Sequence, residues 1–164
     1  MRLFAIGDLH LSGNPPKKPM EVFGPRWINH WQRIREDWLS RVHEDDVVLI
    51  AGDTSWAMHL KEAQEDLDEI RELPGTKYII RGNHDYWWES AGKLNRLDEG
   101  KGMHYLYGST VTLDEGRIAV CGTHGWVCPG DIHYHEEKDA KPYRRELLRV
   151  ERCLQEAAAL NCEH

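Results

Sequence analysis

The sequence predicts an α/β fold built around a parallel β-sheet. Three short segments, at positions 2–6, 47–51 and 77–80, consist mainly of apolar residues, as buried strands do. Two segments with apolar residues at helical spacing, 27–42 and 59–73, lie between these runs. An order of strand, helix, strand, helix, strand is typical of parallel strands joined by crossover helices.

The elements of the N-terminal half follow in turn. The strand at 2–6 ends at Gly7-Asp8, and residues 12–25 are too rich in proline, glycine and polar residues for regular structure. The helix at 27–42 is amphipathic, and a turn leads into the strand at 47–51, which ends at Gly52-Asp53. The helix at 59–73 is terminated by Pro74-Gly75, and the strand at 77–80 follows it.

The C-terminal half contains shorter elements. We expect a helix at about 88–97 and strands at 103–107, 111–113 and 118–121, with a turn at 114–116 between the last two. Residues 122–141 are predicted to form a loop and residues 142–160 a helix. The length of 164 residues suits a single domain spanning residues 1–164.

Charge and composition narrow the function classes. The net charge is −7, from 21 basic and 28 acidic residues, which disfavours non-specific binding to nucleic acid or to anionic membranes. A phosphorylated substrate remains possible because bound cations invert the local charge of a pocket. No segment has the length of a signal peptide or a membrane helix, so we expect a cytoplasmic protein. The four cysteines show no CxxC pair and are expected to be reduced thiols.

Polar side chains that can bind metals follow each of the three apolar strands. They are Asp8 and His10 after the first strand, Asp53 after the second, and Asn83 and His84 after the third. Ligands of parallel sheets bind beyond the carboxyl ends of the strands, so these residues should converge. Strand-like alternation would point Asp8 and His10 to the same side, and the preceding glycines would allow tight turns close to the ions. Oxygen and imidazole ligands suit Mn, Fe or Zn.

These motifs resemble those of the calcineurin-like metallophosphoesterase family. Gly7-Asp8-Leu9-His10, Gly52-Asp53 and Gly82-Asn83-His84-Asp85 match the D-x-H, G-D and G-N-H-D/E motifs of that family in order. The resemblance implies an αββα sandwich of two β-sheets flanked by helices. It also implies two divalent metal ions held by Asp8, His10, Asp53 and Asn83, with Asp53 bridging them. A metal-bridging hydroxide would attack a phosphate ester, and His84 would serve as the catalytic residue that assists the leaving group.

Two departures from the family pattern affect the expected activity. The protein-phosphatase extension G-D-x-x-D-R-G is absent, since Trp56 and Ala57 stand where its Asp and Arg would be. The later family ligands, a strand-end His and a Gly-His-x-His motif, have no match after residue 160, so we expect a C-terminally incomplete domain that lacks its last strands. We therefore expect at most one tightly bound metal, little activity and self-association through uncovered sheet edges. An impaired scaffold or a nuclease of the same fold are the alternative functions.

Further residues are candidates for contact with substrate. Arg81 adjoins Asn83 and could meet a phosphate or form a structural ion pair, and His124 follows a predicted strand end. His133 and His135 have the His-x-His spacing but lie in a predicted loop, where solvent exposure is the simpler interpretation. Phosphomonoester, phosphodiester, nucleotide and protein substrates all remain open.

Overall fold

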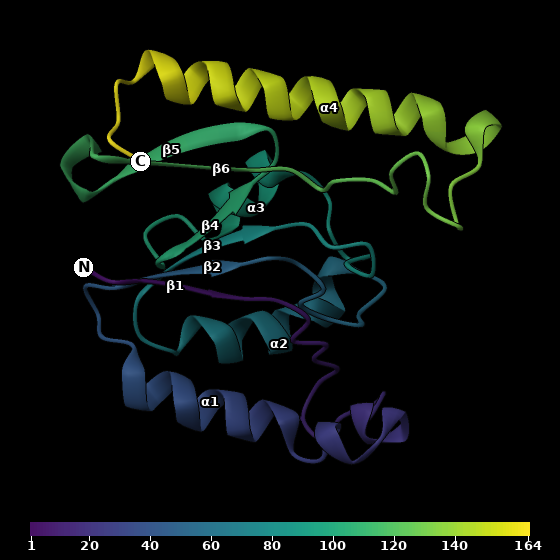
Figure 1. Ribbon diagram of the computed structural model, residues 1–164. Coiled ribbons are helices and arrows are strands. Elements are labelled where there is room, and N and C mark those ends of the chain that lie inside the picture. Colours follow the sequence, from purple (N-terminus) through teal and green to yellow (C-terminus); the bar gives the residue numbers. More distant parts are fainter. The chain divides into compact units, whose positions relative to one another are not determined.

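The computed structural model describes residues 1–164, which form two compact units. The first unit is Met1–Tyr105 and the second is Leu106–His164. Figure 1 shows the course of the chain through both. That residues 1–164 act as a single domain stays a prediction. None of the helices has the length and apolar character needed to cross a membrane.

The first unit contains a sheet whose strand order is β1-β2-β3-β4. Its strands are β1 (Leu3–Ile6), β2 (Val47–Ile50), β3 (Thr76–Ile80) and β4 (Met103–Leu106), of which the last residue belongs to the second unit. Strand β2 pairs in parallel with β1 and with β3, so it is central among the three predicted strands. The predicted parallel sheet is therefore confirmed, with strand bounds within one or two residues of those expected.

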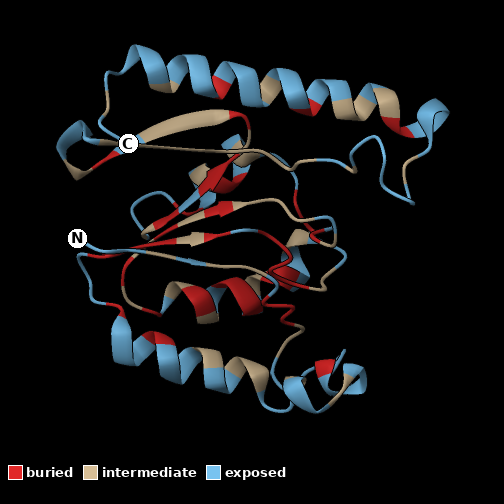
Figure 2. Cartoon of the chain, in the orientation of Figure 1, coloured by how far each residue is buried: buried red, intermediate tan, exposed pale blue.

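Two helices lie on one side of this sheet (Figure 1). They are α1 (His30–Arg41) and α2 (Leu60–Arg71), and their apolar faces join the strand residues in one core. Figure 2 shows buried residues concentrated in β2, β4 and α2, whereas buried and half-buried residues alternate in β3. The core includes Trp38, Val48, Ile50, Leu67, Ile70 and Ile79. The predicted helices at 27–42 and 59–73 are thus present, each slightly shorter than expected.

Three details of the first unit differ from the prediction. Helix α1 begins at His30 because Asn29 adopts a left-handed conformation, with φ of 51°. Residues 12–25 are not wholly irregular, because they contain the 3₁₀ helix η1 (Met20–Phe23), and a second one, η2 (Pro25–Trp27), follows. The third helix, α3 (Ala91–Leu97), begins later than residue 88 because the Ser90 side chain caps it by accepting a hydrogen bond from the Lys93 N–H.

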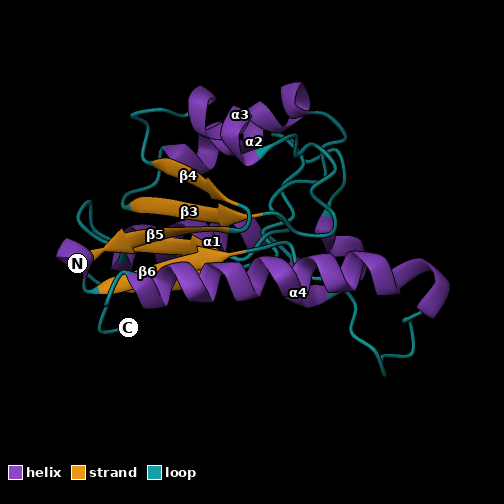
Figure 3. Ribbon diagram, turned by 90° about the horizontal axis from the view of Figure 1, so that it is seen from above, coloured by secondary structure: helices purple, strands orange, loops and turns teal.

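The second unit is a β-hairpin with one long helix. Strands β5 (Ser109–Leu113) and β6 (Ile118–Gly122) pair in antiparallel fashion and are joined by the 3₁₀ helix η3 (Asp114–Gly116). Helix α4 (Glu136–Ala159) packs along the hairpin (Figure 3). A parallel sheet, an antiparallel sheet and flanking helices together give the predicted α/β class.

Helix α4 begins six residues before the predicted start at residue 142. The Asp139 carboxylate accepts a hydrogen bond from the His135 backbone N–H at 2.8 Å, which stabilises the first turn. Acidic residues in that turn also interact favourably with the positive end of the helix dipole. Pro142 consequently lies inside the helix, in its second turn. The predicted loop therefore ends at residue 135.

Candidate metal centre

The segments that follow β1 and β2 remain paired beyond the ends of the strands. The backbone N–H groups of Asp8, His10 and Leu11 donate to the carbonyls of Gly52, Asp53 and Thr54, at 3.1, 2.9 and 3.0 Å. The Trp56 N–H then donates to the Leu11 carbonyl at 2.8 Å. Main-chain hydrogen bonds thus fix the first two predicted motifs against each other.

Three of the predicted ligand residues have a left-handed backbone. The φ angles are 58° at Asp8, 48° at His10 and 51° at Asp53. Residues other than glycine seldom adopt this region, and such conformations cluster at functional sites. The expected strand-like alternation does not apply, because neither Asp8 nor His10 lies in a strand. Their side chains are brought together by these two left-handed residues instead.

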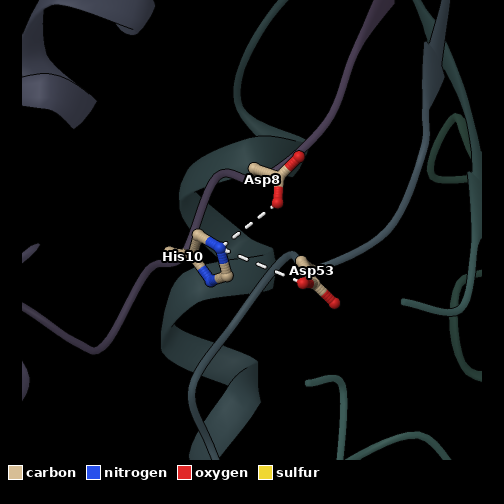
Figure 4. A group of neighbouring side chains, drawn as sticks. All are labelled: Asp8, His10 and Asp53. Atoms are coloured by element: carbon tan, nitrogen blue, oxygen red, sulfur yellow. Dashed lines mark ion pairs between the residues drawn. The ribbon is translucent and has the colours of Figure 1, made fainter. Parts of the chain in front are cut away.

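The side chains of Asp8, His10 and Asp53 converge (Figure 4). The Nε2 atom of His10 lies 3.3 Å from Oδ1 of Asp8 and 3.9 Å from Oδ2 of Asp53. One donor atom from each residue falls within 4.8 Å of the others. Two carboxylate oxygens and one imidazole nitrogen suit a first-row divalent cation. His10 and Asp53 are buried, whereas the Asp8 side chain is 71% exposed, so the group can be reached from solvent.

His84 binds the Asp53 carboxylate from the third strand end. The Nδ1 atom of its ring lies 2.8 Å from Oδ2 of Asp53, and its backbone N–H donates to Oδ1 at 2.9 Å. Burial raises the pKa of Asp53, but the hydrogen bonds and charge of His84, together with His10, outweigh it, and the net pKa lies below its ordinary value. The carboxylate therefore stays ionised, as metal binding requires.

Asn83 is exposed beside the ring of His84, with its side-chain nitrogen 3.0 Å from Nδ1. The same Nδ1 atom of His84 is directed at Asp53. The metal-binding role of Asn83 and the catalytic role of His84 stay predictions.

Glycines allow the second and third strand ends to approach closely. A Cβ atom on Gly82 would lie 2.0 Å from Oδ1 and 2.1 Å from the backbone nitrogen of Asp53. A Cβ atom on Gly52, which has a φ of 88°, would lie 2.4 Å from the nitrogen of Gly82. No side chain fits at either position. That the glycines bring the backbone close to metal ions stays a prediction.

Asp85, to which the sequence assigned no role, holds the same two segments together. Its carboxylate is fully buried and accepts hydrogen bonds from the backbone N–H groups of Thr54, Ser55 and Gly82 at 2.8, 3.2 and 2.8 Å. The indole of Trp87 donates to it as well, at 2.9 Å. Burial raises the pKa of Asp85, and the four donors counteract this only in part. The place of Asp85 at the end of the G-N-H-D motif was the sequence signal that could have indicated this role.

The remaining candidates lie outside this group of side chains. Arg81 is half-buried just after β3, and His124 belongs to the second unit, where its ring contacts Trp126 edge-on at 5.9 Å. His133 and His135 lie in the loop before α4, and both are exposed. Substrate contacts by Arg81 and His124 stay predictions.

A groove of about 770 Å³ in the first unit reaches the candidate metal group. It runs between β1 and α1, and Asp8 lines it together with apolar side chains such as Ile6, Trp27 and Ile34. Arg26 and Arg33 also line it. Cationic groups in this groove favour the approach of an anion.

Comparison with known proteins gives one match to a family. The family model for calcineurin-like phosphoesterases matches residues 1–161. No curated protein matches the chain. Among solved structures, a protein of unknown function from Aquifex aeolicus is similar, with 18% identity and a TM-score of 0.45 over 91% of this chain and 71% of that one.

Proposed function

Because the chain belongs to the calcineurin-like phosphoesterase family, we propose that it is a metal-dependent phosphoesterase that hydrolyses a phosphate mono- or diester. The observation that carries the proposal is the convergence of Asp8, His10 and Asp53, each held in a left-handed conformation. The backbone strain at three adjacent polar residues is typical of a site maintained for function rather than for stability.

The residues present suit a divalent cation. Asp8, His10 and Asp53 would hold the first ion, whereas Asp53 and Asn83 alone would hold a second ion only weakly. Manganese, iron and zinc all accept this set of oxygen and nitrogen donors. Such ions neutralise the phosphate and make an attacking water more acidic at neutral pH. Phosphoryl transfer needs this neutralisation because negative charge spreads over the phosphate oxygens.

The chain's own residues supply orientation and a proton. Asp53 is anchored through Oδ1 by the His84 N–H and through Oδ2 by the His84 ring, so its carboxylate cannot rotate freely. With Nδ1 of His84 directed at Asp53, Nε2 is the ring nitrogen that serves the leaving-group oxygen. A carboxylate that orients an imidazole in this way also stabilises its protonated form. His84 would thus act as a general acid.

The test is hydrolysis of p-nitrophenyl phosphate and bis(p-nitrophenyl) phosphate with Mn²⁺, which also separates monoesterase from diesterase activity. Asp53→Asn should lower turnover by more than about 100-fold. Loss of a residue that only orients a metal ligand typically costs about 10–100-fold, so a larger loss is expected for a ligand itself. His84→Gln should lower the rate by about 10²–10⁴-fold, as expected for a lost general acid. Asp68→Asn, at an exposed carboxylate of α2 paired with Arg71, is the matched control and should retain full activity.

Each alternative has its own result in this test. Turnover that survives a chelator, or that is unaffected by Asp53→Asn, would contradict the proposal. Bound Mn²⁺ with no turnover of either ester would favour a non-catalytic scaffold. Cleavage of single-stranded DNA at a rate well above that of both esters would favour a nuclease.

A further inference from the structure

Trp56 contacts both histidines of the site. Its indole stacks on the His10 ring with centroids 4.8 Å apart and planes inclined by 19°. The same indole lies 4.8 Å from the His84 ring at an angle of 53°. The two imidazoles are 5.8 Å apart, so one aromatic side chain touches both. We propose that Trp56 is a positioning residue that orients His10 for metal binding and His84 for catalysis, an inference that rests on the proposed function.

The His10 ring needs support of this kind. A metal-binding histidine usually donates its second ring N–H to a carboxylate or a carbonyl, which fixes the orientation of the ring. In this protein Nε2 of His10 faces Asp8 and Asp53, while Nδ1 is buried and has no hydrogen-bond partner. A hydrogen bond therefore does not set the orientation. Aromatic packing does, through the Trp56 face and, edge-on, through Trp27 at 6.0 Å.

Trp56 is itself held in place from several directions. Its indole N–H lies 3.2 Å from the sulfur of Met20, which is buried in η1. The Lys18 ammonium lies 5.5 Å from the indole centroid and donates to the Trp56 carbonyl at 3.2 Å. The Trp56 backbone N–H is bonded to Leu11, next to His10. A side chain fixed at both ends can hold a neighbouring ring at a set angle.

The position of Trp56 in the sequence agrees with this role. It is the third residue after Asp53, where the protein-phosphatase extension of the G-D motif has an aspartate. An indole cannot ligate a cation or accept a proton there. The chemistry that Trp56 offers is a rigid apolar face, which orients the imidazoles by packing and excludes water from one side of His10.

The first measurement is Mn²⁺ affinity by calorimetry on the 164-residue chain. Trp56→Leu should weaken binding by about 10–100-fold, the range for residues that orient a ligand. Trp56→Phe keeps an aromatic face and should stay close to the wild type. Trp31→Leu, at another half-buried tryptophan of the same unit, is the control and should bind Mn²⁺ normally. Unchanged affinity in folded Trp56→Leu, or an equal loss in Trp31→Leu, would overturn the proposal.

The second measurement uses the metal-free protein and therefore separates this inference from the proposed function. The ring protons of His10, assigned by comparison with His10→Gln, should be shifted in the NMR spectrum by the ring current of Trp56. The shift should be reduced in Trp56→Phe and mostly lost in Trp56→Leu. If wild-type protein binds no Mn²⁺, the proposed function fails, and this spectrum alone decides the role of Trp56. Should Trp56→Leu not fold, an unchanged His10 shift in Trp56→Phe would overturn the proposal.

Discussion

Gly82→Ala tests the close contact on which the candidate metal centre depends. The added Cβ would meet Oδ1 and the backbone nitrogen of Asp53 at 2.0 and 2.1 Å, about 1 Å closer than real Cβ atoms approach other atoms. The backbone of the two segments must separate, or Asp53 must turn away. Over-packing of this kind costs about 1–3 kcal/mol, and contact with rigid backbone places this case at the upper end.

The expected result has two parts. A loss of about 3 kcal/mol lowers the melting temperature of a chain of this size by about 6–12 °C. Displacement of Asp53 also breaks its hydrogen bonds with His84, so Mn²⁺ affinity should fall together with stability. Thermal denaturation followed by circular dichroism and calorimetric Mn²⁺ titration measure these two effects.

A matched glycine provides the control. Gly92 lies in α3, and a Cβ there would have its nearest neighbour, the end of the Arg96 side chain, at 3.8 Å. Alanine is the better helix former by up to about 1 kcal/mol, so Gly92→Ala should be as stable as the wild type or more so. If Gly82→Ala melted and bound Mn²⁺ as Gly92→Ala does, the packing of Gly82 against Asp53 would be refuted.

Three more substitutions give distinct results. Asp85→Asn removes a charged acceptor from four N–H donors and should lower the free energy of unfolding in urea by about 1.5–3 kcal/mol. An unchanged value would contradict the bonds described. Burial lowers the pKa of Lys77 to about 8, below its unfolded value near 10.4. Between about pH 8 and 10 the unfolded chain binds a proton that the folded chain has lost, so wild-type stability in urea should rise with pH in this range. Lys77→Met should lack this rise. The side-chain hydrogen bond from Arg2 lowers the pKa of Asp46. It therefore contributes stability that is present above about pH 4, the unfolded pKa of an aspartate, and is lost at lower pH. Arg2→Met should accordingly lose less stability than the wild type between about pH 5 and pH 3.

The sequence allowed the sheet and the core of the site to be predicted for one physical reason. Three mainly apolar runs with helical segments between them specify parallel strands, and parallel strands bring their carboxyl ends to one edge. Asp8 and Asp53 follow neighbouring strands, so topology placed them at the same edge, and the left-handed backbone then turns their side chains together. The bounds of the strands could be predicted from the apolar runs without knowledge of side-chain contacts.

Features that depend on contacts distant in sequence were not predictable. The left-handed conformation of His10 accompanies a main-chain bond to Asp53, more than forty positions away, which no local pattern of the sequence reveals. The contact of Trp56 with Met20 spans 36 positions, so no local pattern predicted how the Trp56 indole is held. Helix α4 starts early because the Asp139 side chain bonds to the His135 backbone N–H. A prediction from the spacing of apolar residues does not include such a contact.

The main-chain pairing that continues past β1 and β2 has a consequence for ligand binding. Residues 8–11 carry no regular helix or strand, yet three of their amides are bonded to the neighbouring segment and should exchange slowly with deuterium. Slow exchange in the metal-free protein would mean that Asp8 and His10 lose little conformational freedom when an ion arrives. Such preorganisation leaves more of the interaction energy available as affinity.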